Sequence, residues 1–172
     1  FLNNKKIVLH QIPSGILRPN CHCLLGNGMV IDPVALIDEI KLVESLGISI
    51  NKQLIIASNA HIVTPLHKFI DKNNEANTED AIGTTCRGIG PAYADKFNRI
   101  GIQAIELLDA KNLEKKVFHR LKSSINKNEI YKDQNRELLK SFELFFESAN
   151  KIKKYIKDSH TIIQKNLKDN KN

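Results

Sequence analysis

The sequence has little that would cross-link the chain. Its 172 residues contain three cysteines and no tryptophan, and aromatic residues make up only 6%. An odd number of cysteines without a framework spacing argues against a disulfide scaffold and is typical of free thiols in a reducing compartment, so we expect a cytoplasmic protein. No apolar run has the length of a membrane span, and the first residues do not resemble a signal peptide. We therefore expect no membrane partner.

The remaining composition is that of a globular domain. Hydrophobic residues make up 41% and charged residues 26%, values that disordered chains do not show. The formal net charge is +7, which could favour nucleic acid. However, the lysines are densest in the C-terminal third, where a solvated helix face accounts for them, and few aromatic residues are available to stack on bases. A basic helical module that binds nucleic acid is therefore the alternative interpretation, and a phosphorylated small molecule would also need basic residues.

Strand and helix signals alternate through the first half of the chain. Short strands are predicted at residues 6–12 and 54–57. Short apolar runs at 21–25 and 29–31 lie on either side of a tight turn at Gly26-Asn27-Gly28. Asp32-Pro33 and Thr64-Pro65 each predict a helix start, with a capping side chain followed by proline at the first helical position. The first helix is expected to end near Gly47 and the second near Asp71, before a loop at 73–80. This alternation predicts an α/β fold.

The second half is predicted to be mainly helical. One helix is expected from Pro91 to about Arg99, and helix again from Asn112 onward. Apolar residues there follow one stripe with a period near 3.6 residues, as in a core-facing helix. The stripe consists of Leu138, Phe142, Phe145, Ala149, Ile152, Ile156, Ile163 and Leu167. We therefore predict a single partial domain over 1–172, with an α/β part at 1–110 and a helical section at 111–172.

Residues 82–91, Ile-Gly-Thr-Thr-Cys-Arg-Gly-Ile-Gly-Pro, are the least ordinary segment. Glycines let backbone N–H groups approach an anion, hydroxyls and an arginine add donors, and a helix N-terminus favours negative charge. Lys96 and Arg99 follow one helix later as further cationic donors. The segment predicts a phosphate site, and the alternative is a glycine-rich turn with a surface arginine. It is not a P-loop, because no Gly-Lys-Ser/Thr follows.

The cysteines and histidines do not predict a metal site or a nucleophile. On a strand, Cys21 and Cys23 would share one face while His22 points away, and no second ligand pair lies nearby in sequence. Cys86 lies beside an arginine, but no placed base is evident, so a small packed residue is the favoured interpretation. The histidines are scattered along the chain.

Three segments in this order resemble the adenylosuccinate synthetases. They are residues 8–17 (VLHQIPSGIL), residues 26–33 (GNGMVIDP) and residues 82–93 (IGTTCRGIGPAY) with the following Lys96 and Arg99. The resemblance covers residues 1 to about 110, and the remainder is similar only in being helical. It implies a P-loop NTPase-like α/β fold and a cytoplasmic homodimer. It also implies a C–N bond-forming ligase that joins IMP and L-aspartate with GTP and Mg²⁺ in de novo AMP biosynthesis.

The resemblance also assigns roles to individual residues. Thr85 matches the threonine that binds the IMP phosphate, and Arg99 matches an arginine that reaches the IMP of the partner subunit. Four neighbours are expected to support the same loop: Gly83, Thr84, Arg87 and Gly90. Two positions depart from the family pattern, since Cys86 stands where glycine is usual and Ile100 where a second arginine is common. A side chain at position 86 would strain the loop if that position requires a positive φ.

Several elements of the family are absent from this sequence. It lacks the GDEGKGK loop, with its catalytic aspartate, and the catalytic histidine that follows. The later aspartate-binding loop and the guanine-binding region are also missing. Together with a first residue that is not methionine, this predicts an interior fragment that is inactive by itself. The ligands of GTP and Mg²⁺ are accordingly expected outside these residues.

Overall fold

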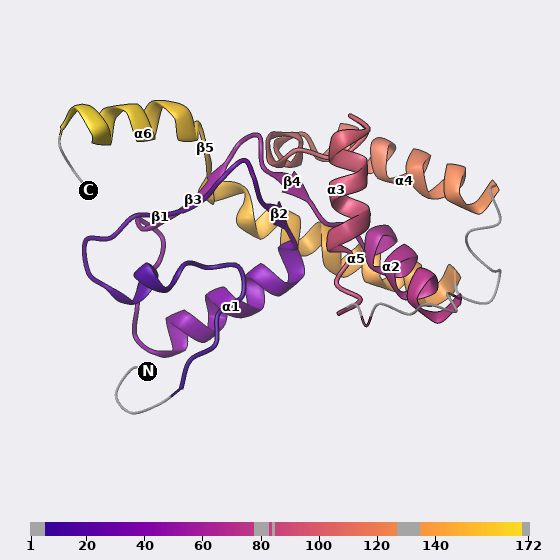
Figure 1. The fold of residues 1–172 in the computed structure, drawn as a ribbon, viewed down its shortest axis with the longest axis horizontal. Helices are drawn as coiled ribbons and strands as arrows, with labels where there is room; N and C mark the ends of the chain where they lie inside the picture. Colours follow the sequence, from indigo (N-terminus) through magenta and orange to yellow (C-terminus); the bar gives the residue numbers. More distant parts are fainter. Residues whose placement is uncertain (1–5, 78–82, 84, 127–134, 170–172) are drawn as a thin grey trace.

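The computed structural model describes residues 6–77, 83, 85–126 and 135–169 (Figure 1). Within them, two small parallel sheets are surrounded by helices. The three-stranded sheet has the order β1-β3-β5, and the two-stranded sheet pairs β2 with β4. The strands are β1 Cys23–Leu25, β2 Val30–Ile31, β3 Leu54–Ala57, β4 His61–Ile62 and β5 Ile156–Lys157. The predicted α/β class is therefore confirmed.

The two sheets arise from one strand–helix–strand unit. β1 and β2 follow each other along the chain, and so do β3 and β4, so the two pairs form in succession with Cys23 opposite Leu54 and Val30 opposite His61. Parallel neighbours need a crossover connection, which α1 (Pro33–Ser45) provides. The strand predicted at 54–57 is thus confirmed as β3, and the apolar runs at 21–25 and 29–31 contain β1 and β2.

The first helix begins and ends as the sequence predicts. The Asp32 carboxylate accepts hydrogen bonds from the N–H groups of Val34 and Ala35, at 3.1 and 3.4 Å. Pro33 occupies the first helical turn, where its missing N–H costs nothing. Gly47, with φ +79°, follows the last turn and ends the helix.

The remaining helices cover the sheets and one another. They are α2 Pro65–Asn77, α3 Ile89–Phe97, α4 Ala110–Asn126, α5 Asn135–Ile152 and α6 Ser159–Lys168, with 3₁₀ turns η1 Ser14–Leu17, η2 Ala104–Leu108 and η4 Lys153–Tyr155. α5 packs against both α1 and α2, and α3 lies against α2 (Figure 1). No helix in the described part of the chain is long and apolar enough to cross a membrane.

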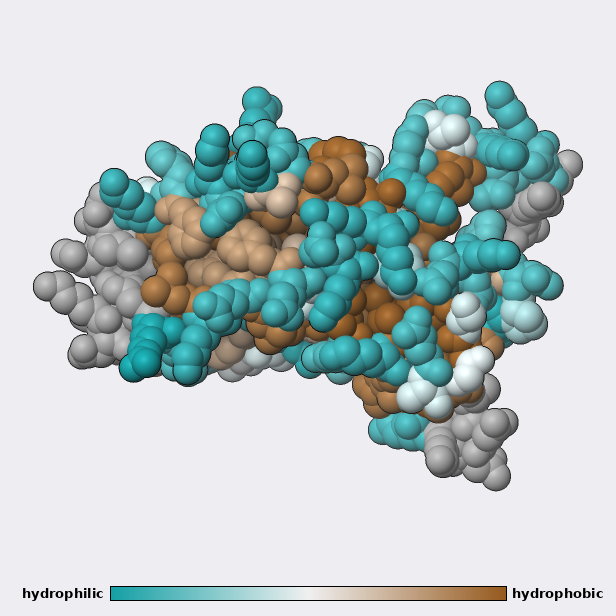
Figure 2. All heavy atoms as spheres, turned by 180° about the vertical axis from the view of Figure 1, so that it is seen from behind, coloured by the Kyte–Doolittle hydropathy of each residue, from teal (hydrophilic) through white to brown (hydrophobic). Residues whose placement is uncertain are grey.

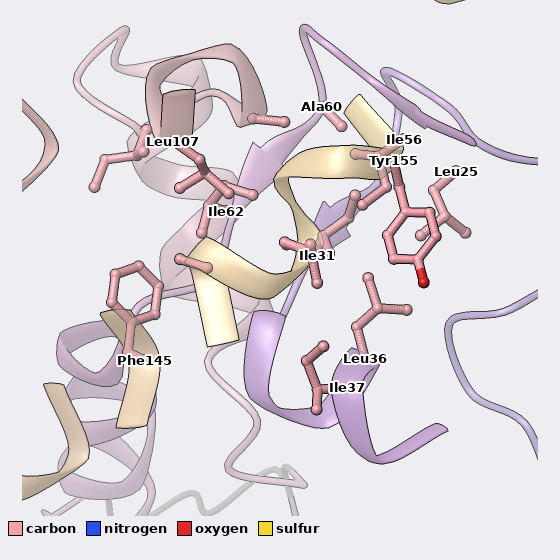
Figure 3. Packing of buried hydrophobic residues seen from close by; sticks show 14 of the residues in the cluster. Leu25, Ile31, Leu36, Ile37, Ile56, Ala60, Ile62, Leu107, Phe145 and Tyr155 are labelled. Carbon is pink, nitrogen blue, oxygen red and sulfur yellow. The ribbon is translucent and has the colours of Figure 1, made fainter. Parts of the chain in front are cut away.

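The core lies where the sheets meet α1 and α5. Side chains from β1, β2, α1, β3, β4 and α5 converge there with Tyr155 of η4 (Figure 3). The fully buried members include Leu25, Ile31, Leu36, Ile56, Ile62, Phe145 and Tyr155. Burying a side chain of this size stabilises a protein by about 1.5–3 kcal/mol, so these contacts fix the sheets against the helices.

The strand predicted at residues 6–12 is wrong. The N–H groups of Gln11 and Ile12 donate to the Glu39 carboxylate of α1 at 3.0–3.1 Å, rather than to a neighbouring strand. Glu39 is 7% exposed, and these backbone donors satisfy the carboxylate inside the fold. A side chain thus takes the place of a strand partner.

The apolar stripe of the C-terminal section is divided between different elements. Its residues from Leu138 to Ile152 are buried on α5, as predicted. The helix then stops, and β5 pairs with β3, placing Ile156 opposite Ile56. Ile163 and Leu167 lie on α6 and are 45% and 69% exposed, so the expectation of one core-facing helix fails for them. After Ile152 the chain leaves the helix and adds β5 to the edge of β3 that β1 leaves open.

Helix lengths account for two smaller differences. α2 continues to Asn77, so the loop predicted at 73–80 is wrong for residues 73–77, and residues 78–80 lie outside the described residues. α3 starts at Ile89, two residues before the predicted Pro91. Proline is still accommodated there, because the first turn of a helix makes no use of its N–H group.

The aromatic residues of α4 and α5 pack against one another. The ring centroids of Phe118 and Phe142 lie 6.5 Å apart, and those of Phe145 and Phe146 lie 5.3 Å apart. Seen from behind, apolar surface gathers in broad areas that are bordered by hydrophilic side chains (Figure 2). These phenylalanines therefore contribute to helix packing, where they are poorly placed to stack on bases.

Candidate functional site

The three sequence segments that carry the family resemblance meet around one cavity of about 760 Å³. His10 and Gln11 line it from the first segment, and β2 with the first turns of α1 lines it from the second. The third contributes Thr85, Arg87 and the start of α3. Three segments that are not contiguous in sequence thus form one concave site, as expected for a small-molecule ligand.

Thr85 and Arg87 are the exposed polar residues that the loop presents at this cavity. The guanidinium of Arg87 makes no hydrogen bond or ion pair with the described residues, and the Thr85 hydroxyl likewise has no partner among them. A threonine hydroxyl and a guanidinium suit a phosphate oxygen, since both donate hydrogen bonds and one carries a charge. Thr84, the neighbour expected to support the loop, lies outside the described residues.

Two glycines of the loop, Gly83 and Gly88, donate their N–H groups to the protein and not to a ligand. The N–H of Gly83 donates to Glu75 Oε1 at 2.6 Å, and the N–H of Gly88 donates to Asp71 Oδ2 at 2.8 Å. Both carboxylates belong to α2, so these two N–H groups hold the loop against that helix and are not available to a phosphate. Gly90 lies on α3, and a Cβ there would meet nothing within 4 Å.

Cys86, which stands where the family usually has glycine, has a positive φ. Its φ is +51°, in the left-handed region that non-glycine residues adopt at a cost of roughly 1–2 kcal/mol. Gly83 and Gly88 also have positive φ, at +74° and +75°. The thiol side chain is tolerated, but the loop carries a strain that glycine would remove.

The opposite rim of the cavity is fixed by hydrogen bonds that link the first two segments. Gln11 Nε2 donates to the carbonyl of Asp32 at 3.1 Å, and the N–H of Asp32 donates to Gln11 Oε1 at 2.8 Å. The Asp32 carboxylate also pairs with Lys68 Nζ at 2.5 Å. Sequence reasoning did not single out Gln11, Glu39 or Lys68. Glu39 could have been found, because it lies three residues after Leu36 on the buried face of α1.

Lys96 does not face this cavity. Its ammonium donates to the carbonyl of Asn27 at 2.6 Å, while the Tyr93 hydroxyl donates to the carbonyl of Gly28 at 2.8 Å. These two contacts attach the turn at residues 26–28 to α3. The prediction that Lys96 contributes a phosphate donor is therefore not supported by its position, and the side chain instead positions the second segment against the third.

Arg99 lies beyond the other end of α3, outside the cavity that Thr85 lines. It follows the helix cap with φ +60° and is exposed, and its guanidinium has no partner among the described residues. It lines a second cavity of about 510 Å³ with His61, Lys96 and Lys116. Burial, and next the charge of Lys96, lowers the pKa of His61, which favours the neutral imidazole. The chain therefore does not bring Thr85 and Arg99 together.

A buried charge network fixes α3 between α2 and α4. His67 Nδ1 accepts from the N–H of Thr64 at 3.0 Å, which places its proton on Nε2, 3.1 Å from Asp95 Oδ2. Arg120 donates to both Asp95 oxygens at 2.8 and 2.7 Å. Burial by itself would raise the pKa of Asp95, but the hydrogen bonds from His67 and Arg120 outweigh it and lower that pKa. The network thereby holds the helix between Thr85 and Arg99.

The described residues provide no site for a metal ion. No three histidine, cysteine, aspartate or glutamate side chains are grouped within them as ligands. The resemblance predicts Mg²⁺ and GTP on residues beyond this sequence, and the geometry here assigns neither of them a ligand.

Comparison with known proteins agrees with this arrangement. The family model for adenylosuccinate synthetase matches residues 1–172. The chain is 42% identical to the adenylosuccinate synthetase of Chlorobium limicola over 172 residues and 43% identical to that of Pediococcus pentosaceus over 176 residues. These alignments cover 98% and 99% of the chain, but 39% and 40% of the relatives.

A solved structure gives the same result for the fold. The fully ligated adenylosuccinate synthetase of Plasmodium falciparum is similar with a TM-score of 0.82 and 34% sequence identity. The similarity covers 98% of this chain and 39% of that one. The chain thus spans about two fifths of the length of the relatives that it matches.

Proposed function

Because this chain belongs to the adenylosuccinate synthetase family, we propose that it forms the part of such a ligase that binds the phosphate of IMP and contacts a second subunit. The whole enzyme would join IMP and L-aspartate to give adenylosuccinate in AMP biosynthesis. GTP would phosphorylate the purine 6-oxygen, and aspartate would then displace that phosphate. The observation that carries the proposal is the meeting of the three family segments at one cavity, with Thr85 and Arg87 on its wall.

In this proposal the chain binds and orients its substrate. The Thr85 hydroxyl donates to a phosphate oxygen, and Arg87 adds positive charge at the same mouth. The network around Asp95 and the contacts of Lys96 with the turn at 26–28 keep the walls in place. GTP and Mg²⁺ would be bound by other parts of the family fold, and the enzyme would work in the cytoplasm.

The nucleic-acid alternative has no support from this geometry. The phenylalanines that follow the lysine-rich segments pack on one another between α4 and α5. A single-strand binder needs aromatic faces open to bases along a basic groove. The family match, which extends over all 172 residues, accounts for the chain without such a module.

Replacing Thr85 tests the phosphate site. Losing a donor to a charged group costs about 1.5–3 kcal/mol, so Thr85→Ala should weaken IMP binding by roughly tenfold or more. Binding is measured calorimetrically in the polypeptide completed with the remaining family segments. Thr85→Ser keeps the hydroxyl and should retain most of the affinity. An alanine variant that binds IMP as tightly as the parent would remove Thr85 from the site.

We further propose that the second subunit is another copy and that Arg99 acts on its nucleotide. Two features of this end of α3 support a partner. Phe97, which lines the same cavity as Arg99, is 78% exposed, and Ile100, the next residue in sequence, is 39% exposed. The guanidinium of Arg99, which has no partner among the described residues, also lies outside the cavity that Thr85 lines. An exposed phenylalanine next to an arginine is typical of a protein interface, where aromatic residues and arginine are enriched.

Mixed dimers test whether Arg99 acts in trans. A complete enzyme with Arg99→Leu is combined with one inactivated at the catalytic aspartate of the family. If Arg99 serves the opposite subunit, a mixed dimer contains one site with both defects and one with neither. Random exchange of equal amounts makes half of the dimers mixed, so activity should return to about a quarter of the unmutated level. If Arg99 serves its own subunit, every site keeps a defect. No recovery after proven subunit exchange would exclude the trans role.

A further inference from the structure

Cys21 and Cys23 form a pair of thiols that the proposed function leaves unused. Cys23 is the first residue of β1 and Cys21 lies two residues before it. In an extended chain, side chains two residues apart lie on the same face. A Cβ built on Gly15 would lie 3.0 Å from Cys21 Sγ and 3.5 Å from Cys23 Sγ. The two sulfur atoms therefore lie beside the same point of η1.

The two thiols differ in access to solvent. Cys23 is 3% exposed, and its thiol donates to the carbonyl of Pro13 over 3.8 Å. Cys21 is half-buried and can be reached from outside. Gln53 fixes the backbone between them and the sheet, because its side chain donates to the carbonyl of Cys21 at 3.1 Å and its carbonyl accepts from the N–H of Cys23 at 2.7 Å.

We propose that Cys21 and Cys23 are a reversible disulfide site that is oxidised by small disulfides of the glutathione class. Two residues of a strand span about 6.6 Å, which lies within the Cα separations of roughly 4.4–6.8 Å that a disulfide permits. Side chains on the same face of an extended segment start with about the same separation, whereas a disulfide needs Cβ atoms about 3.5–4.5 Å apart. The bond therefore forms with strain and with a shift of Cys21, which precedes β1. Strained disulfides are reduced easily, as is typical of regulatory rather than structural bonds.

The reaction is a pair of thiol–disulfide exchanges. The Cys21 thiolate attacks oxidised glutathione, forms a mixed disulfide and releases one glutathione thiolate. The Cys23 thiolate then attacks the Cys21 sulfur and releases the second. In total, one glutathione disulfide is reduced to two thiols, and the two protein thiols become one disulfide. Burial, and next the neighbouring Cys21, raises the pKa of Cys23 to about 11, so the second exchange should be the slower one.

Oxidation would reach the edge of the nucleotide cavity through Pro13. A disulfide removes the Cys23 S–H that donates to the carbonyl of Pro13. Pro13 directly follows Gln11 and Ile12, whose N–H groups are bound by Glu39, and Gln11 lines the cavity. The redox state of Cys23 is thus linked to the cavity wall through its contact with Pro13 and through the nearby Gln11, which lines the cavity.

Mass spectrometry of the 172-residue chain tests the proposal. Wild type and Cys86→Ser are incubated with oxidised glutathione at pH 8, and intact mass and peptide mapping are recorded. We expect both to lose two hydrogens, with the bond mapped to the peptide that contains Cys21 and Cys23, and to recover them with dithiothreitol. In the Cys86→Ser background, Cys23→Ser should stop at one glutathione adduct on Cys21. The proposal would be overturned if the Cys86→Ser chain, with Cys21 and Cys23 both present, also stopped at the glutathione adduct on Cys21 or stayed reduced.

The pH dependence gives a second, independent test. Because the attacking Cys23 thiol has a pKa near 11, the closing step should accelerate about tenfold per pH unit between pH 7 and pH 9. The step is followed by quenching with acid after the Cys21 adduct has been prepared. A closing rate that does not change over this range would contradict the role of Cys23, whereas the expected rise supports it.

Discussion

Replacing Gly88 with alanine should remove roughly 2–5 kcal/mol of stability. The added Cβ would lie 2.7 Å from the backbone nitrogen of Lys68 and 2.8 Å from the carbonyl carbon of His67. Both atoms belong to α2 and cannot rotate away as the end of a side chain could. Gly88 also has φ +75°, a conformation that alanine adopts only with strain. The loop and the start of α3 would have to separate from α2.

Gly90→Ala is the matched control for this experiment. It adds the same methyl group two residues later, within α3, where a Cβ would meet nothing within 4 Å. Alanine favours helix over glycine by about 1 kcal/mol, so this variant should be as stable as the parent or more stable. Urea unfolding of the 172-residue chain measures both. Equal midpoints for the two variants would show that the close approach of Gly88 to α2 does not exist.

Replacing Asp95 with asparagine should also be strongly destabilising. The carboxylate receives hydrogen bonds from His67 and Arg120 and is 14% exposed, while the Arg120 side chain is 27% exposed. Removing one partner from a largely buried ion pair costs about 3 kcal/mol or more, because the remaining charge loses its compensation. The asparagine amide would in addition turn donors toward either the imidazole or the guanidinium.

The same network predicts a dependence on pH. The pKa of Asp95 is lower in the folded chain than the usual value of about 3.9, so its contribution is complete above that value and is lost as the pH falls through the folded pKa. The stability of the parent should therefore fall more steeply below pH 4 than that of Asp95→Asn. Asp38→Asn is the control, because Asp38 pairs with Lys41 at 3.0 Å on the surface, where both side chains are more than two thirds exposed. Such a pair contributes about 0–1 kcal/mol.

A parallel pH slope in parent and Asp95→Asn would contradict the network. So would a loss of stability in Asp38→Asn as large as that in Asp95→Asn, since burial is the feature that distinguishes the two carboxylates. The result also bears on the site, because Asp95 fixes the helix that connects the loop of Thr85 with Arg99.

Local signals in the sequence determined the helix starts, the main strands and the family. Asp32-Pro33 sets the start of α1 because capping and the missing proline N–H act within one turn of the chain. Residues 54–57 form β3 because an uninterrupted apolar run is stable when both faces are covered. The loop around Thr85 was recognisable because its residues form a contiguous motif that resembles the family, although Gly83 and Gly88 donate to carboxylates 8 and 17 residues away. Whether Thr85 and Arg99 bind nucleotide stays a prediction.

The tertiary structure decided which partner each polar or apolar group finds. Gln11 and Ile12 were expected in a strand, but a buried carboxylate 27 or 28 residues away takes their N–H groups. Lys96 was expected at a phosphate, yet it holds the turn at Asn27, which is 69 residues away in sequence. The apolar stripe ends at Ile152 because β3 has a free edge that β5 can pair with. Hydrogen bonds and apolar contacts are satisfied in space, so their partners follow from how the helices and sheets pack.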